Sequence, residues 1–332
     1  MNSPAHRANG PTGRPGAVPE VNSASSRAKR REGRAARRAQ RRHEDQQHDI
    51  PLHLLGVRRS TVRVITVVCM LFAFFTLAPV VYMAFCATKT QLNINDSFPF
   101  WFARPFELTQ NISLLFQNLG GDGVFARWFA NTVVYALLGG GGATLVSVMG
   151  GYGFAHFHFR GARFGFVLVI GTLLVPITAI SLPLYLIYAK AHLINSIWGM
   201  VLPSMVSPIG VYLMRTFARS HVPRSVIDAA RIDGAGEARI FLTVGLPLLV
   251  PGVVTVLLIN VVAVWNNFFL PLLIFSNQNL YPLSVGIGDR AGGGASVLLA
   301  TGGLASVLPL IGLFLVLQRY WKGALLLGSV TG

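Results

Sequence analysis

The sequence predicts an all-α integral membrane protein with six transmembrane helices, and three observations support this fold class. The chain of 332 residues is 52% hydrophobic and only 12% charged, whereas soluble domains carry about 25% charged residues. Six stretches contain no charged residue at all: 64–88, 128–159, 164–189, 191–214, 240–288 and 291–318. Each stretch can hold the roughly 20 apolar residues that a helix needs to cross a bilayer.

The distribution of basic residues predicts the orientation of these spans. If the N-terminus is cytoplasmic, 23 of the 28 Lys and Arg residues lie on the cytoplasmic side. Cytoplasmic loops carry the excess of basic residues in membrane proteins. We therefore expect a multi-pass protein of the cell (inner) membrane with both termini in the cytoplasm.

The N-terminal part contains two predicted regions. Residues 1–60 are basic and poor in large apolar side chains, which predicts a disordered cytoplasmic extension. A nucleic-acid role is disfavoured because the extension lacks interleaved aromatic residues or a recognisable module. Residues 61–124 are expected to hold the first transmembrane helix, near 62–87, and an extracytoplasmic segment whose aromatic residues suit the membrane interface.

Residues 125–332 form the predicted core of five further transmembrane helices. Their expected bounds are about 128–155, 165–189, 196–215, 248–272 and 297–318. The second span of the chain contains four successive glycines, Gly139 to Gly142. Small residues let helices approach closely in membranes, and four glycines also allow local unwinding. We favour packing because nothing polar accompanies them.

A charged loop at 222–247 separates the span near 196–215 from the span near 248–272. Pro223 opens a predicted helix over 223–234, because proline is tolerated in the first turn. Gly234 follows the helix, where a left-handed residue is needed. Ala229 and Ala230 give this helix a small-residue face that suits close docking on a partner. Alternatively, the charges are satisfied within the helix, through Arg224–Asp228 and Asp228–Arg231 pairs.

The spacing of Ala229-Ala230, Asp233-Gly234-Ala235, Leu246-Pro247 and Pro251 resembles the coupling loop of bacterial ABC importer permeases. Further motifs of residues 125–332 resemble the binding-protein-dependent carbohydrate family, in particular the maltose-type second permease subunit. They are Asn131-Thr132, Leu182-Pro183-Leu184-Tyr185, residues 193–199, Leu202-Pro203, residues 208–217, Trp265-Asn266-Asn267-Phe268 with Pro271, and residues 318–332. Two positions depart from the family pattern: Asp228 replaces Glu, and Asn267 replaces an acidic residue.

The resemblance implies a function. The chain would be a permease subunit of an ATP-driven sugar (oligosaccharide) importer and would form half of the translocation pore. It would pair with a second permease subunit as a heterodimer, with two copies of a cytoplasmic ATPase subunit and with an extracytoplasmic solute-binding protein. Membrane lipid and a sugar substrate complete the expected contacts, and no nucleic acid is expected.

The same resemblance assigns the coupling contact to the loop. Docking on the ATPase would involve Asp228, Ala229, Ala230, Asp233 and Gly234, and closure of the ATPase pair would rock the spans to give alternating access. The chain itself has no Gly-Lys phosphate loop, so ATP is expected to bind a separate subunit. We expect no enzyme activity, no cofactor and no metal in this chain.

Candidate substrate-path residues lie near the end of the span at 248–272. They are Asn260, Trp265, Asn266, Asn267 and Phe268. Polar groups within a membrane are costly and often functional, and these could hydrogen-bond and stack on a sugar. Asparagines also bond neighbouring helices, and the sequence leaves both readings open.

Two rival functions are considered. An ABC permease for another solute, such as glycerol phosphate or a polyamine, would keep the loop and change the pore lining. An ATP-independent secondary transporter would carry acidic residues or a row of charges inside its spans. The six charge-free stretches contain neither.

Overall fold

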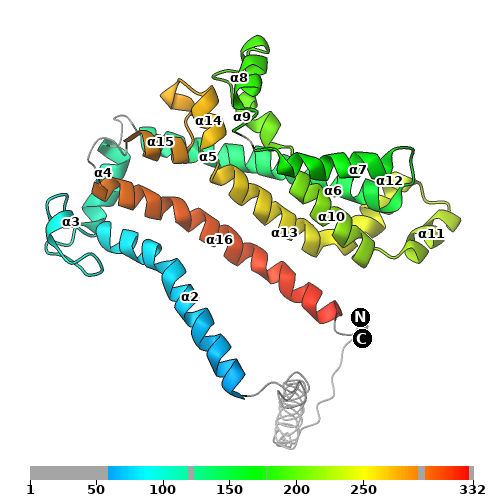
Figure 1. Cartoon of the computed structure of the whole chain (residues 1–332), viewed down its shortest axis with the longest axis horizontal. Coiled ribbons are helices and arrows are strands. Elements are labelled where there is room, and N and C mark those ends of the chain that lie inside the picture. The colour runs from blue at the N-terminus through cyan, green and yellow to red at the C-terminus, as the bar shows by residue number, and fades with distance from the viewer. Residues whose placement is uncertain (1–58, 119–122, 177, 291–295, 329–332) are drawn as a thin grey trace, which may run out of the picture. The chain divides into compact units, whose positions relative to one another are not determined.

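The computed structural model describes residues 59–118, 123–176, 178–290 and 296–328 (Figure 1). The predicted extension at 1–60 therefore lies almost entirely outside the described residues. The chain divides into two units, Met1–Thr76 and Leu77–Gly332. The described part of the first unit is the beginning of helix α2 (Arg59–Cys86), whose side chains between Val64 and Phe75 are exposed and mainly apolar.

The described residues form helices and connecting turns, without a strand. Before the loop at 222–247 they are α2, α3 (Asn93–Asp96), α4 (Leu108–Asn118), α5 (Val124–Tyr135), the π-helical turn η1 (Ala136–Gly140), α6 (Gly141–His156), α7 (Ala162–Gly171), the 3-10 turn η2 (Thr172–Leu174), α8 (Ser181–Lys190), α9 (Ile197–Ser204) and α10 (Pro208–His221). From the loop onward they are α11 (Arg224–Ile232), α12 (Glu237–Ile240), the π-helical turn η3 (Phe241–Gly245), α13 (Leu246–Trp265), α14 (Phe269–Ile274), the 3-10 turn η4 (Gln278–Leu280), α15 (Leu283–Arg290) and α16 (Ser296–Gly328). The all-α fold class is confirmed.

Five helical segments of the described residues are long and apolar enough to cross a membrane. They are Ser60–Cys86, Val124–His156, Ile197–His221, Glu237–Trp265 and Val297–Tyr320. The remaining expected span, 165–189, is divided. Helix α7 with η2 ends at Leu174, Val175 is extended because it precedes Pro176, and α8 starts again at Ser181. The structure thus has five long spans, with two shorter helices in place of the third of the six expected.

The fifth predicted span is shorter at its end than the sequence suggested. Its helix α13 stops at Trp265, not near residue 272. The chain turns at Asn266 and resumes in the short helix α14, where the side-chain oxygen of Asn267 accepts a hydrogen bond from the Leu270 backbone N–H at 3.2 Å. This side-chain bond offers the backbone an alternative to continuing α13.

The centre of the second unit consists of α6, α10 and α13, which lie side by side (Figure 1). The glycine run lies in this interface. A Cβ added at Gly140 would come 2.9 Å from the Cα of Val261 in α13, so the two backbones touch where only glycine fits. The run stays helical through η1 and α6. Packing, the favoured interpretation of these glycines, is confirmed for Gly139, Gly140 and Gly142, whereas Gly141 faces open space.

Candidate functional site: the loop between α10 and α13

Helix α11 begins and ends as the loop sequence predicts. Pro223 is the extended N-cap residue before Arg224, and Gly234 adopts the left-handed conformation with φ +80°. The Ala235 N–H donates to the Ala230 carbonyl and the Gly234 N–H to the Arg231 carbonyl, both at 3.0 Å. This pair of bonds is a Schellman motif, which satisfies the last carbonyls of a helix and needs a residue that tolerates positive φ.

One buried side chain holds α11 against the membrane-spanning helices. Ile227 is 2% exposed and belongs to a cluster of buried residues drawn from α6, α10, the loop and α13. Ala230 and Ala235 pack partly against the same cluster. A helix with one apolar side against a core gains its stability from that packing, because nine residues are too few to be helical alone.

The structure separates the two alanines that the sequence placed on one face. Ala230 is half-buried against the cluster, whereas Ala229 is exposed. Val226 is also exposed, and Ile232 is 87% exposed. The outward side of α11 therefore exposes three apolar residues, Val226, Ala229 and Ile232.

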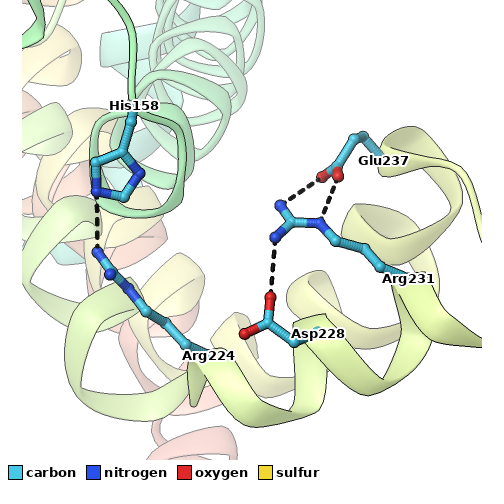
Figure 2. A network of polar contacts seen from close by, with 5 residues as sticks. All are labelled: His158, Arg224, Asp228, Arg231 and Glu237. Atoms are coloured by element: carbon cyan, nitrogen blue, oxygen red, sulfur yellow. Dashed lines mark hydrogen bonds and ion pairs between the residues drawn. The ribbon is translucent and has the colours of Figure 1, made fainter.

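Three of the six charged residues of the loop pair with one another, as Figure 2 shows. The Nε and Nη2 atoms of Arg231 donate to the two carboxylate oxygens of Glu237 at 2.7 and 3.3 Å. Its Nη1 donates to Asp228 at 3.0 Å. The hydrogen bond from Arg231 to Glu237 is the main cause that raises the pKa of the guanidinium. One arginine thus joins α11 to the start of α12.

The predicted alternative, in which the charges pair within the helix, is confirmed for Asp228 with Arg231. It is wrong for Arg224 and Asp228, because the Nη2 atom of Arg224 lies 3.4 Å from Nε2 of His158 instead (Figure 2). Glu237 was not among the predicted site residues. Only the turn at Gly234 brings it to Arg231, so sequence spacing gave no signal for it.

Asn260, a candidate for the substrate path, is a buried link between three helices. It is 3% exposed. Its Nδ2 donates to the Thr144 hydroxyl of α6 at 3.2 Å, and its Oδ1 accepts from the Ser207 hydroxyl at the start of α10 at 2.7 Å. Both polar ends of the amide therefore bond neighbouring helices, which is the second of the two alternatives that the sequence leaves open for these asparagines.

The other candidate substrate-path residues near the end of α13 lie in different environments. Trp265 is buried and meets Phe129 edge to face, with ring centroids 6.0 Å apart. Asn266 is exposed and donates to the Val262 carbonyl of its own helix. Phe268 is exposed. The five candidates do not converge on one point.

Two of the five candidates line a common cavity. Asn260 and Asn267 contribute to a hollow of about 440 Å³ between η2, α8, the α9–α10 junction and α13. Ser204, Ser207 and Thr172 add hydroxyl groups to its wall. This mixture of apolar walls and a few amide and hydroxyl groups suits a small polar solute. The serines were not predicted, since isolated serines carry no sequence signal.

No group of three or more His, Cys, Asp or Glu residues that could hold a metal occurs in the part of the chain that the structure describes.

Comparisons with known proteins agree on one family. A model of the family "binding-protein-dependent transport system inner membrane component" matches residues 143–322. The arabinooligosaccharides transport system permease protein AraQ of Bacillus subtilis is 33% identical over 67% of this chain and 78% of its own length. The melibiose/raffinose/stachyose import permease protein MelC of the same organism is 33% identical over 50% of this chain and 62% of its own length.

A solved structure has the same fold. It is described as the crystal structure of a bacterial ABC transporter involved in the import of the acidic polysaccharide alginate. The match has a TM-score of 0.67 at 22% identity and covers 80% of this chain and 99% of that one.

This chain belongs to the family of binding-protein-dependent transport system inner membrane components. It is a permease subunit, a class of transport protein rather than of enzyme, and it works in a system that uses a solute-binding protein. The resemblance stated from the sequence is thereby confirmed.

Proposed function

We propose that this chain forms half of the translocation pore of an ATP-driven importer of oligosaccharides. The observation that carries the proposal is the build of α11, a short helix whose inner side is anchored by Ile227 and whose outer side exposes apolar residues. Exposed apolar groups on a charged loop mark an interaction site. The two related permeases named above, whose names refer to sugars, support the choice of substrate class.

The outer side of α11 is the proposed contact with a separate ATPase subunit, which would bind the ATP. Ala229 permits close approach, Ile232 supplies an apolar anchor, and Asp233 offers a charge beside it; all three are exposed. Gly234 sets the direction of the chain after the helix. Asp228 and Ala230 contribute indirectly in this proposal, since Asp228 bonds Arg231 and Ala230 packs on the cluster.

Movement would pass from α11 to the spans through two connections. Ile227 belongs to a buried cluster that also contains residues of α6, α10 and α13, and Arg231 holds α12 through Glu237. A displacement of α11 by a closing ATPase pair would therefore act on three spans together. Packed helices shift between discrete arrangements rather than bending continuously, which is what alternating access requires.

The remaining partners complete the proposed assembly. A second permease subunit would supply the other half of the pore, two ATPase subunits would bind on the cytoplasmic side, and both termini would lie in the cytoplasm. The excess of basic residues on that side supports the orientation. Within the pore, we assign the sugar contact to the cavity lined by Asn267 and the wall hydroxyls, with Asn260 holding the wall in place.

The docking proposal is tested by purifying the tagged chain in mild detergent and identifying the proteins that accompany it. We expect an ATPase and a second permease with the unaltered chain. The ATPase should be lost in Ala229→Arg, and also in Gly234→Pro, because proline cannot adopt a φ of +80°. The matched control is Ala238→Arg, which places the same side chain on an exposed alanine of α12.

The co-purification results distinguish between the possible roles of α11. Loss of the ATPase in Ala229→Arg but not in Ala238→Arg supports α11 as the docking element. A chain that keeps the ATPase in both docking variants contradicts α11 as the docking element, and a chain that purifies without an ATPase contradicts the ATP-driven assembly and favours an ATP-independent transporter. The substrate class is tested separately by uptake of labelled oligosaccharides; uptake of glycerol phosphate or a polyamine in their place would overturn only the sugar.

A further inference from the structure

A pocket of about 750 Å³ gathers a group of arginines that the transport mechanism does not use. It opens between the turn that joins α6 to α7, the second half of α10 and the start of α11. Its lining includes five arginines: Arg160, Arg163, Arg215, Arg219 and Arg224. No acidic residue lines it. We call this group the arginine pocket.

Like charges that share a pocket repel one another, so their clustering needs a compensating anion. The only described carboxylates near α11 that form ion pairs, Asp228 and Glu237, are bonded to Arg231. Among the described residues, no hydrogen bond or ion pair engages the guanidinium of Arg160, Arg163 or Arg219. Three arginines in one pocket therefore have unused donors, and each guanidinium can donate to an oxyanion through two parallel N–H groups.

The other two arginines are held in place by their neighbours. The guanidinium carbon of Arg215 lies 3.7 Å from the centroid of the Phe166 ring, and its Nε donates to the Phe154 carbonyl at 3.3 Å. Arg224 is oriented by His158. Stacking on an aromatic face and donating at the same time is a property of arginine that lysine does not share. The inner part of the pocket is thus pre-organised rather than a random surface charge.

Apart from His158, the rest of the lining is apolar, and the apolar surface continues along α7. Phe154, Phe157, Phe159 and Phe166 line the pocket. Val167 of α7 also lines it, and Phe164 and Leu168 are exposed on the same helix. The pocket also lies beside the end of the candidate span Val124–His156. An anionic group with hydrocarbon attached to it matches this combination better than a small free anion.

From this arrangement we propose that the arginine pocket binds the phosphate headgroup of an anionic membrane lipid. The phosphate would lie among Arg160, Arg163 and Arg219, and an acyl chain would follow the exposed apolar side of α7. Basic pockets between transmembrane helices on the cytoplasmic side are suited to such headgroups. The outer residues of α11 that we assign to the ATPase do not line the pocket, so the two sites are distinct.

Occupation of this site would connect three elements. Arg160 lies in the turn after α6, Arg163 in α7 and Arg219 in α10, and one phosphate shared among them would hold these elements together beside Arg224 at the start of α11. The lipid would therefore stabilise the loop that transmits movement. This role concerns the membrane around the permease and does not depend on which solute it carries.

The test uses the full chain purified in uncharged detergent and measures lipid binding by native mass spectrometry. The probes are cardiolipin, phosphatidylglycerol, phosphatidylcholine and inorganic phosphate. We expect the two anionic lipids to bind at least tenfold more tightly than phosphatidylcholine. In the double variant Arg160→Gln, Arg163→Gln this affinity should fall about thirtyfold, since each basic residue near an anionic surface contributes roughly a factor of five.

Two further variants make the result specific. Arg239→Gln removes an arginine of the same loop region that does not line the pocket, and it should leave the affinity unchanged. The double variant Arg160→Lys, Arg163→Lys keeps both charges and should lose less than the glutamine pair. Because Arg160 and Arg163 are exposed, folding should be retained; an unchanged elution volume and melting temperature would verify this.

Several outcomes would overturn the proposal. Equal binding of phosphatidylcholine, or an equal loss in Arg239→Gln, would mean that no built site exists. Competition by inorganic phosphate at the same affinity would assign the pocket to a free anion instead of a lipid. Unchanged lipid binding in the glutamine variant, together with loss of co-purifying ATPase, would make the arginines part of a protein interface.

Discussion

The loop around α11 and the interior of the helix packing around α13 use polar side chains in opposite ways. In the interior, Asn260 is buried and bonds two other helices with both ends of its amide. In the loop, Asp228, Arg231 and Glu237 bond one another and leave the exposed apolar residues to face outward. Polar groups thus join the spans inside, whereas on the loop they are mutually satisfied and the apolar groups are left for a partner.

The largest expected effect concerns the residue that anchors the loop. Replacement of Ile227 by Ala removes a side chain that is 2% exposed, and the loss of burial and the resulting cavity should cost about 2–5 kcal/mol. We expect a clear fall in melting temperature of the purified chain in detergent. Ile232→Ala is the matched control, because that side chain is 87% exposed. Similar melting temperatures for the two variants would contradict the distinction between the two sides of α11.

A second effect comes from a close approach between the spans that contain Gly140 and Val261. Gly140→Ala places a Cβ 2.9 Å from the Cα of Val261, and overpacking of this kind costs about 1–3 kcal/mol. Gly141→Ala provides the control, since a Cβ there meets no atom within 4 Å. A thermal-shift assay should separate the two variants. If Gly140→Ala were as stable as Gly141→Ala, glycine would not be required for the contact between these helices.

A smaller effect is expected at the buried amide. Asn260→Leu leaves the hydroxyls of Thr144 and Ser207 without this partner, and interhelical hydrogen bonds in membranes contribute about 0.6 kcal/mol each on average. The melting temperature should fall modestly, and transport should fall only in proportion to the folded fraction. Asn266→Leu, which loses a bond to its own helix, should change less. Loss of transport with unchanged stability would instead make Asn260 a substrate contact.

The smallest effect is expected at the surface ion pair. Glu237→Gln weakens the link between α11 and α12, but exposed ion pairs contribute little to global stability. We expect an unchanged melting temperature and faster limited proteolysis between Asp233 and Gly236. Asp233→Asn is the control, because no ion pair involves Asp233 among the described residues. Equal proteolysis of both variants would show that Arg231 does not hold the turn.

Most of the architecture was predictable because membrane spans are encoded by composition. A helix that must cross a bilayer needs an uninterrupted apolar stretch, and such stretches are visible without any contact information. The prediction failed where proline and asparagine act locally. Val175 is extended before Pro176, which divides the expected third span. The side chain of Asn267 accepts a hydrogen bond from the Leu270 backbone where the fifth span was expected to continue.

The ends of α11 were predictable from the sequence, whereas the direction in which its side chains face was not. Pro223 and Gly234 indicated the limits of α11 because each fits a backbone conformation that few other residues favour. The direction in which Ala229 and Ala230 face was not predictable. Adjacent helical residues differ by about 100° around the axis, so the position of the buried cluster decides which one is exposed.

The class of protein, the location of most spans and the ends of the loop helix could be inferred from the sequence, because these depend on local composition and backbone preference. Which side chains meet depends on the tertiary structure. It joined Glu237 to Arg231, placed Asn260 between two hydroxyls and collected five arginines around one pocket. Those contacts join residues from different helices or across a turn, and their distances depend on how the helices pack rather than on the order of residues.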